Sequence, residues 1–164
     1  MTDAPRVRRT GRLSSVAGTF FRAVDRDHVA AALDGSRVHG RYSRSDQPTL
    51  YLSASPAGVR AAMVAHQRST DNPREVVAFR VDGEAIFDLR DRASIAEARA
   101  QAGDPFANWQ EAIARGESPA SWRVRDWIEA QGANGLLDPS RQSSGLWHLV
   151  LFRWNVAGAP FVRA

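Results

Sequence analysis

The stretch GRYSRSDQPTLYLSASPAGVRAAMVAH, residues Gly40–His66, carries the clearest fold signal in this sequence. Its middle, Thr49–Ser53 (TLYLS), is apolar and rich in residues that favour β-structure, so it predicts a strand. Ser55 and Pro56 follow almost at once, and a serine N-cap with proline at the first helical position predicts the start of a helix. We expect this helix to run to about Gln67. The stretch therefore predicts a strand that leads directly into a capped helix.

Outward from this stretch, further strands and helices follow in no regular order. Strands are predicted at Phe20–Val24, Glu75–Val81, Ala85–Leu89, Leu136–Leu137 and Leu146–Trp154, and helices at Asp27–Leu33, Ser94–Gln101, Trp109–Arg115 and from Ser118 to about Gln131. The pair Asp82-Gly83 between two of these strands is typical of a hairpin turn. The strand at 146–154 is apolar on both faces, so we place it inside a sheet. Because strands and helices do not alternate regularly, we predict an α+β fold.

Length and composition predict one globular domain. The chain has 164 residues, of which 43% are hydrophobic and 24% charged. We expect a flexible N-terminal tail over residues 1–12 and a single domain over 13–164. The basic start precedes only a short, weakly apolar stretch, so we expect no signal peptide, and no apolar run approaches the length of a membrane span. The absence of cysteine excludes disulfides and thiolate metal sites, and agrees with a cytoplasmic location.

All 22 basic residues are arginine, and the formal net charge is +4. An arginine-rich surface can bind phosphate or nucleic acid. Here the arginines are spread along the chain and mixed with 18 acids, and only Arg6–Arg12 forms a run. A coding preference for arginine explains this pattern more simply, so we expect no direct contact with nucleic acid or membrane. A steep salt dependence of DNA binding would favour the opposite interpretation.

Motifs for most common chemistries are missing. The sequence contains no HExxH, GxGxxG, GxxxxGK[ST] or GxSxG pattern, and its four histidines lack the spacing of metal ligands. The absence of lysine excludes a Schiff base or a P-loop lysine. We therefore expect no metal site.

Polar residues at the ends of apolar segments are the remaining candidates for a binding site. Arg22 lies inside a predicted strand, Tyr51 lies in the strand at 49–53, and Arg41 precedes that strand. Ser140 and Arg141 occupy a turn between two apolar segments. Arginine suits a diphosphate, tyrosine stacks on flat rings and serine bonds a ribose or amide, so together these residues would suit a dinucleotide. Taken singly, each residue also fits a structural or surface role.

In chain order, several segments resemble the RES domain family, which is named after an arginine, a glutamate and a serine. These segments are FFRAV, GRYS, LYLSASPAGVRAAMVAH, NGLLDPSRQSSG and LVLFRWN. They place Arg22 at the early arginine of the family, Arg41 in its GRW-type turn and Tyr51 at its tyrosine. Ser140 matches the family serine, and Arg141 follows it. Members of this family are bacterial toxins encoded beside an antitoxin with an Xre-like DNA-binding domain.

The resemblance implies a compact α+β fold related to ADP-ribosyltransferases, and cleavage of the nicotinamide–ribose bond of NAD⁺ by phosphorolysis or hydrolysis. By position, Arg22 and Arg41 would hold the diphosphate or ribose, and Tyr51 would pack on a ring. Ser140 would bond the nicotinamide-ribose half, with Arg141 beside the cofactor. The resemblance implies NAD⁺ as substrate, no metal cofactor, and an Xre-like antitoxin as protein partner.

The sequence departs from the family at the catalytic acid. Counted from the helix start at Ser55, the glutamate position is occupied by Ala62, and its neighbour Met63 cannot replace a carboxylate. The nearest glutamate, Glu75, lies beyond the helix. The resemblance leaves three explanations, in this order of preference: an inactivated variant of a toxin, a naturally degenerate member, or a protein whose acid comes from another segment. A carboxylate beside the ribose stabilises the oxocarbenium-like transition state, so its loss would lower the rate by several powers of ten.

A non-enzymatic alternative keeps the fold but not the reaction. In that case the chain only binds NAD⁺ or an antitoxin protein. An exposed patch formed by some of the tryptophans at positions 109, 122, 127, 147 and 154 would favour it, whereas buried tryptophans would be ordinary core residues. Trp127 and Ile128 lie three and four residues after Val124, which is the spacing of a buried helix stripe, so we expect those in the core.

Overall fold

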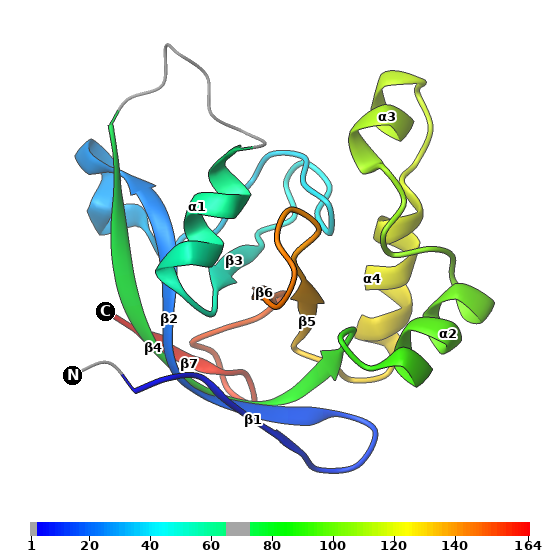
Figure 1. Cartoon of the computed structure of the whole chain (residues 1–164), viewed down its shortest axis with the longest axis horizontal. Coiled ribbons are helices and arrows are strands. Elements are labelled where there is room, and N and C mark those ends of the chain that lie inside the picture. The colour runs from blue at the N-terminus through cyan, green and yellow to red at the C-terminus, as the bar shows by residue number, and fades with distance from the viewer. Residues whose placement is uncertain (1–2, 65–72) are drawn as a thin grey trace.

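The computed structural model of the chain describes residues 3–64 and 73–164 (Figure 1). In chain order its elements are β1 (Arg6–Arg9), β2 (Ser14–Asp25), the 3-10 helix η1 (Arg26–Ala31), β3 (Leu50–Ser53), α1 (Pro56–Val64), β4 (Arg74–Asp88), α2 (Arg92–Gln101), α3 (Trp109–Ala114), α4 (Ala120–Ala130), β5 (Gly135–Pro139), β6 (Trp147–Leu151) and β7 (Phe161–Arg163). The end predicted near Gln67 for the helix that is α1 here lies outside the described residues, as does His66.

The described strands form one sheet in the order β1-β2-β3-β6-β5-β4-β7, and β2 also pairs with β4. The pairings from β2 through β3, β6, β5 and β4 back to β2 therefore form a closed circuit. β4 and β5 run parallel, and the other pairs are antiparallel. β6 lies between β3 and β5, and its last three residues are buried, which confirms the prediction of an interior strand.

Two apolar clusters form the core, one mainly among the strands and one between the sheet and two helices. The first joins side chains of the strands to one another, with Phe20 of β2 and Phe79 of β4 fully buried in it. The second joins the sheet to α2 and α4 through Ala98, Val124 and Ile128. α1 contacts β2 and β3, away from α2 and α4 (Figure 1). This mixture of one sheet and separate helices confirms the α+β fold. Among the described residues, no helix is both long and apolar enough to cross a membrane.

The segment after β3 folds as its sequence predicts. The Ser55 hydroxyl accepts a 3.1 Å hydrogen bond from the Gly58 N–H, and α1 begins at Pro56. The side-chain oxygen satisfies a backbone donor that has no partner within the first helical turn. β3 therefore passes directly into α1, and both elements contribute to the site described below.

The predicted hairpin at Asp82-Gly83 is wrong, because β4 runs without interruption through both residues. Gly83 lies opposite Val16 in the antiparallel pairing of β4 with β2. A Cβ added at Gly83 would lie 2.4 Å from the Cβ of Pro160. The glycine thus allows the C-terminal segment to approach the strand closely, and closely packed backbone is a common reason for glycine inside a strand.

Residues 3–9 differ from the flexible tail expected over residues 1–12. Residues 6–9 form β1, which pairs with residues 14–17 of β2. Gly18 of β2 has a φ of 141°, and a Cβ there would lie 2.7 Å from the Cα of Pro5. The Thr19 N–H donates to the Asp3 carbonyl at 2.8 Å. Tertiary hydrogen bonds, which composition does not show, tie this segment to the sheet.

Candidate functional site

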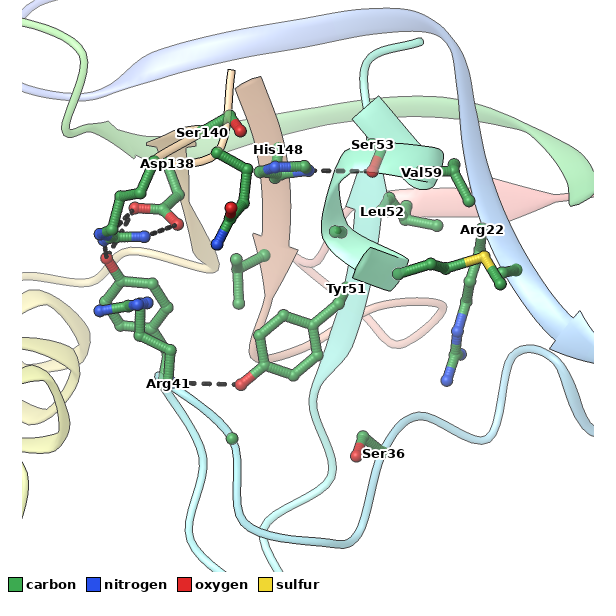
Figure 2. Close-up of a pocket in the computed structure, with 18 of the residues that line it drawn as sticks. Arg22, Ser36, Arg41, Tyr51, Leu52, Ser53, Val59, Asp138, Ser140 and His148 are labelled. Atoms are coloured by element: carbon green, nitrogen blue, oxygen red, sulfur yellow. Dashed lines mark hydrogen bonds and ion pairs between the residues drawn. The ribbon is translucent and has the colours of Figure 1, made fainter. Parts of the chain in front are cut away.

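A cavity of about 490 Å³ lies where β2, β3, α1, α3, the segment before β3 and the β5–β6 connection meet. All the site residues predicted from the sequence line it: Arg22, Arg41, Tyr51, Ala62, Ser140 and Arg141. Figure 2 shows Arg22 on one side of this cavity, Arg41 and Asp138 on the other, and Tyr51 between them. The fold thus gathers residues that are up to 119 positions apart in sequence (Arg22 to Arg141) around one cavity.

Arg22 forms the cationic side near α1. Its position on β2 points the half-buried guanidinium at the carbonyl of Ala32, to which it donates a hydrogen bond. Burial lowers the pKa of Arg22, and the positive charge of Arg74 lowers it further. Arg74 also lines the cavity. Two neighbouring cations repel each other, so an anion placed between them would be stabilised.

Arg41 and Arg141 form a second cationic side. Arg41 donates a 3.0 Å hydrogen bond to the Ala107 carbonyl. Burial lowers the pKa of Arg41, and the charge of Arg141 is the next cause. Arg41 is partly buried and the Arg141 side chain is 27% exposed, and charges interact more strongly in such surroundings than in bulk water. This side of the cavity is therefore also suited to a phosphate or carboxylate.

Asp138 is the acid among the described residues that line the cavity. The residue is 6% exposed, and its carboxylate accepts a 2.8 Å hydrogen bond from the Tyr42 hydroxyl. Arg141 donates to both carboxylate oxygens, at 3.1 and 3.2 Å. Burial raises the pKa of Tyr42 well above its ordinary value, and the negative charge of Asp138 adds to this. Asp138 is thus engaged as an acceptor for two neighbours rather than free to act on a ligand.

Tyr51 is locked in place by the turn that precedes β3. Its hydroxyl accepts a 3.1 Å hydrogen bond from the Tyr42 N–H and shares a 2.7 Å hydrogen bond with the Ser43 hydroxyl. A Cβ at Gly40 would lie 2.7 Å from the Tyr51 hydroxyl oxygen, so this turn admits only glycine without a shift. Burial raises the pKa of Tyr51, which keeps the hydroxyl protonated. The ring is therefore a fixed surface between the two cationic sides.

Ser140 lies in the β5–β6 connection, where its hydroxyl accepts a 3.3 Å hydrogen bond from the Ser143 N–H. His148 of β6 faces the same cavity, and its Nδ1 lies 2.9 Å from the Ser53 hydroxyl oxygen. Burial lowers the pKa of His148, so its neutral form is favoured. Hydroxyl and imidazole groups therefore add uncharged donors and acceptors to the wall.

Ala62 and Met63 line the α1 side of the cavity, and neither side chain carries a carboxylate. Over its described length α1 contains no acid. Glu75 is exposed on β4 and does not line the cavity. Among the described residues no group of three or more metal-binding side chains gathers. The position expected for the family's glutamate thus faces the cavity but offers only a methyl group.

The sequence drew attention to Tyr42 beside Arg41, but Tyr42, Asp138 and His148 were not assigned to the site. Tyr42 and Asp138 each stand beside a predicted residue, in GRYS and in DPSR, and that adjacency is the signal that would have found them. His148 sits in an apolar strand, and nothing in its neighbourhood in the sequence indicates that it faces a cavity.

Comparisons with known proteins agree with the fold and with the family resemblance. The model of the RES domain family matches residues 19–163. A chain in the crystal structure of the M. tuberculosis MbcT-MbcA toxin-antitoxin complex is similar in fold, with a TM-score of 0.52 and 16% sequence identity. The alignment covers 99% of this chain and 85% of that one. A search of curated proteins finds no match.

Proposed function

This chain belongs to the RES domain family, and we propose that it is the toxin of a bacterial type II toxin–antitoxin system whose cavity binds NAD⁺. The observation that supports this most is the gathering of all the predicted site residues in one cavity, with arginines on two sides of a fixed tyrosine ring. A dinucleotide has two anionic phosphates between two flat rings, which this arrangement complements.

The reaction of such a toxin is cleavage of the nicotinamide–ribose bond, with phosphate or water as the acceptor. The volume of about 490 Å³ is in the range of small-molecule sites. Arg22 and Arg41 would hold the diphosphate or ribose, Tyr51 would contact a ring, and Ser140 would bond the nicotinamide-ribose half. Fixing both ends of the cofactor reduces the entropy lost on reaching the transition state. A relation to the ADP-ribosyltransferase fold stays a prediction.

The transition state develops positive charge on the ribose, and a nearby carboxylate would stabilise it. Ala62 supplies none, and Asp138 is already bonded to Tyr42 and Arg141. The sequence as it stands should therefore bind NAD⁺ but turn it over slowly. This supports an inactivated or degenerate member over one whose acid comes from another described segment.

The direct test follows nicotinamide release from NAD⁺ by the chain and by Ala62→Glu, each with and without phosphate. We expect Ala62→Glu to be faster by at least about 10²-fold. Val64→Glu is the matched control, because Val64 is on the same helix, is 74% exposed and does not line the cavity. A phosphate requirement would identify phosphorolysis. If Ala62→Glu and Val64→Glu release nicotinamide at the same rate, the proposed reaction is wrong.

Binding is tested separately by thermal stability. Saturating NAD⁺ should raise the Tm of the unaltered chain, because a ligand that binds only the folded state stabilises it. Arg22→Ala should abolish most of this shift. No shift in the unaltered chain would contradict NAD⁺ binding, and would favour the alternative of a module that binds only protein.

The similar fold in a toxin-antitoxin complex supports an antitoxin as the protein partner, and we assign it the Xre-like type. The site of action is the cytoplasm, where NAD⁺ is available. Expression of Ala62→Glu without a partner should deplete cellular NAD⁺ and stop growth, and expression together with the partner should restore it. Normal growth of cells that contain folded Ala62→Glu would contradict the toxin assignment.

A further inference from the structure

Four of the five tryptophans have clear structural partners. The Trp122 and Trp154 N–H groups donate to backbone carbonyls at 2.9 Å. Trp127 packs edge-on against Phe87 with ring centroids 5.4 Å apart, and Trp147 packs against Phe20. These tryptophans are therefore explained as parts of the fold, without reference to a ligand.

Trp109 is different. It begins α3, is partly buried and lines the cavity together with Gln110. Within residues 3–64 and 73–164, its indole makes no hydrogen bond, ring contact or cation–π contact. A large aromatic ring usually stabilises a fold through such contacts. An unpaired indole in a cavity wall is instead available to a ligand.

The chain segment that carries Trp109 is fixed by the cations of the cavity. Arg41 donates to the Ala107 carbonyl at 3.0 Å, and Arg141 donates to the Pro105 carbonyl at 3.4 Å. The Arg141 guanidinium also lies over the Phe106 ring, 4.7 Å from its centroid. Trp109 follows two residues after Ala107. The indole and the two guanidinium groups are therefore parts of one connected wall.

We propose that Trp109 is a second ring-binding residue of this cavity, in addition to Tyr51: a nucleobase ring of the ligand stacks on the Trp109 indole while the adjoining phosphates contact Arg41 and Arg141. This rests on the proposed function, which it deepens by assigning a ring-binding residue that the sequence did not single out. Stacking on an aromatic side chain suits any base, because every base has a flat π-face. The Gln110 side chain offers one donor group and one acceptor beside the ring for a base edge.

The experiment measures binding by calorimetry for the unaltered chain, Trp109→Ala and Trp109→Phe. The ligands are NAD⁺, AMP, nicotinamide mononucleotide and inorganic pyrophosphate. We expect Trp109→Ala to weaken NAD⁺ binding by roughly 10-fold or more, and Trp109→Phe to restore most of it. Pyrophosphate binding should be unchanged, because it has no ring. AMP and nicotinamide mononucleotide show which base stacks: only one of them should lose affinity in Trp109→Ala.

Phe161→Ala is the control, since Phe161 is 56% exposed on β7 and does not line the cavity. Equal NAD⁺ affinity of Trp109→Ala and the unaltered chain overturns the inference and leaves NAD⁺ binding intact. An equal loss of pyrophosphate binding also overturns it, because the variant has then disturbed the arginines. If the unaltered chain binds AMP through Trp109 but Ala62→Glu releases no nicotinamide, the inference stands and the proposed reaction fails. If none of the nucleotides binds the unaltered chain, both the inference about Trp109 and the proposed function are overturned.

Discussion

The Tyr42 hydroxyl donates a 2.8 Å hydrogen bond to Oδ1 of Asp138 and so joins two segments that are 96 residues apart. Both residues are buried, and Tyr42 is fully so. Arg141 donates to the same carboxylate. This contact fixes the turn before β3 to the end of β5, and it thereby sets the distance between the segments that carry Arg41 and Arg141.

Tyr42→Phe should lower the free energy of unfolding by about 1.5–3 kcal/mol, the usual contribution of a hydrogen bond to a charged group. The phenyl ring keeps the packing, so the loss reports the hydrogen bond. Urea unfolding measures it, and a double-mutant cycle with Asp138→Asn isolates the pair. Additive losses in that cycle would mean that the two side chains do not stabilise each other.

His148 should make folding stability depend on pH. Burial lowers its pKa below the ordinary value of 6.5, so the unfolded chain takes up a proton at a higher pH than the folded chain does. Stability should therefore fall as the pH drops below about 6.5 and should be fully present above it. His148→Gln should flatten this dependence between about pH 7 and pH 5. An unchanged slope in urea unfolding would show that other groups cause it.

Arg125 is a buried cation with a structural role. It is 3% exposed, donates to the Tyr42 carbonyl at 2.9 Å and to the Thr49 hydroxyl at 2.6 Å, and lies over the Phe152 ring. Arg125→Met should cost about 3 kcal/mol, because two buried acceptors lose their donor.

Arg123→Met is the matched control for this prediction. Arg123 is on the same helix but exposed, and surface substitutions change stability by about 0.5 kcal/mol or less. Equal losses from Arg123→Met and Arg125→Met in thermal unfolding would assign the effect to the helix rather than to the buried guanidinium.

Gly40→Ala should displace Tyr51, because the added Cβ would lie 2.7 Å from the Tyr51 hydroxyl oxygen. We expect a loss of about 1–3 kcal/mol of stability, the usual cost of overpacking, together with weaker NAD⁺ binding. Adding Tyr51→Phe removes that oxygen and should recover part of the stability. If the double variant is no more stable than Gly40→Ala, the clash lies elsewhere.

Local signals in the sequence predicted the elements that depend on local contacts. The strand at 49–53 and the Ser55 cap of α1 depend on neighbouring residues, and both formed as expected. The hairpin predicted at Gly83 is wrong because a glycine can lie either in a turn or where another segment, here Pro160, approaches a strand closely. Only the tertiary structure decides between these two roles. β1 was missed for the same reason, since its pairing with β2 stabilises a segment that composition alone marks as polar.

The site residues show the same difference between local signals and contacts made by distant segments. Arg22, Arg41, Tyr51 and Ser140 were predicted from residue type and family resemblance, and the structure places them in one cavity. The Tyr42–Asp138 contact and the place of Trp109 in the cavity wall depend on distances between segments that are far apart in sequence. No pattern within a window of neighbouring residues contains that information.

The closed circuit of strands also sets when the cavity can exist during synthesis. β3 pairs with β2 at the single pair Phe21↔Ser53, whereas it pairs with β6 along four residues. The cavity wall that β3 carries is therefore secured only after residues 147–151 have left the ribosome. Domains generally fold as units once enough chain has emerged. A nascent chain that has not yet exposed β6 would thus lack the completed cavity wall, and the site first forms when β6 pairs with β3.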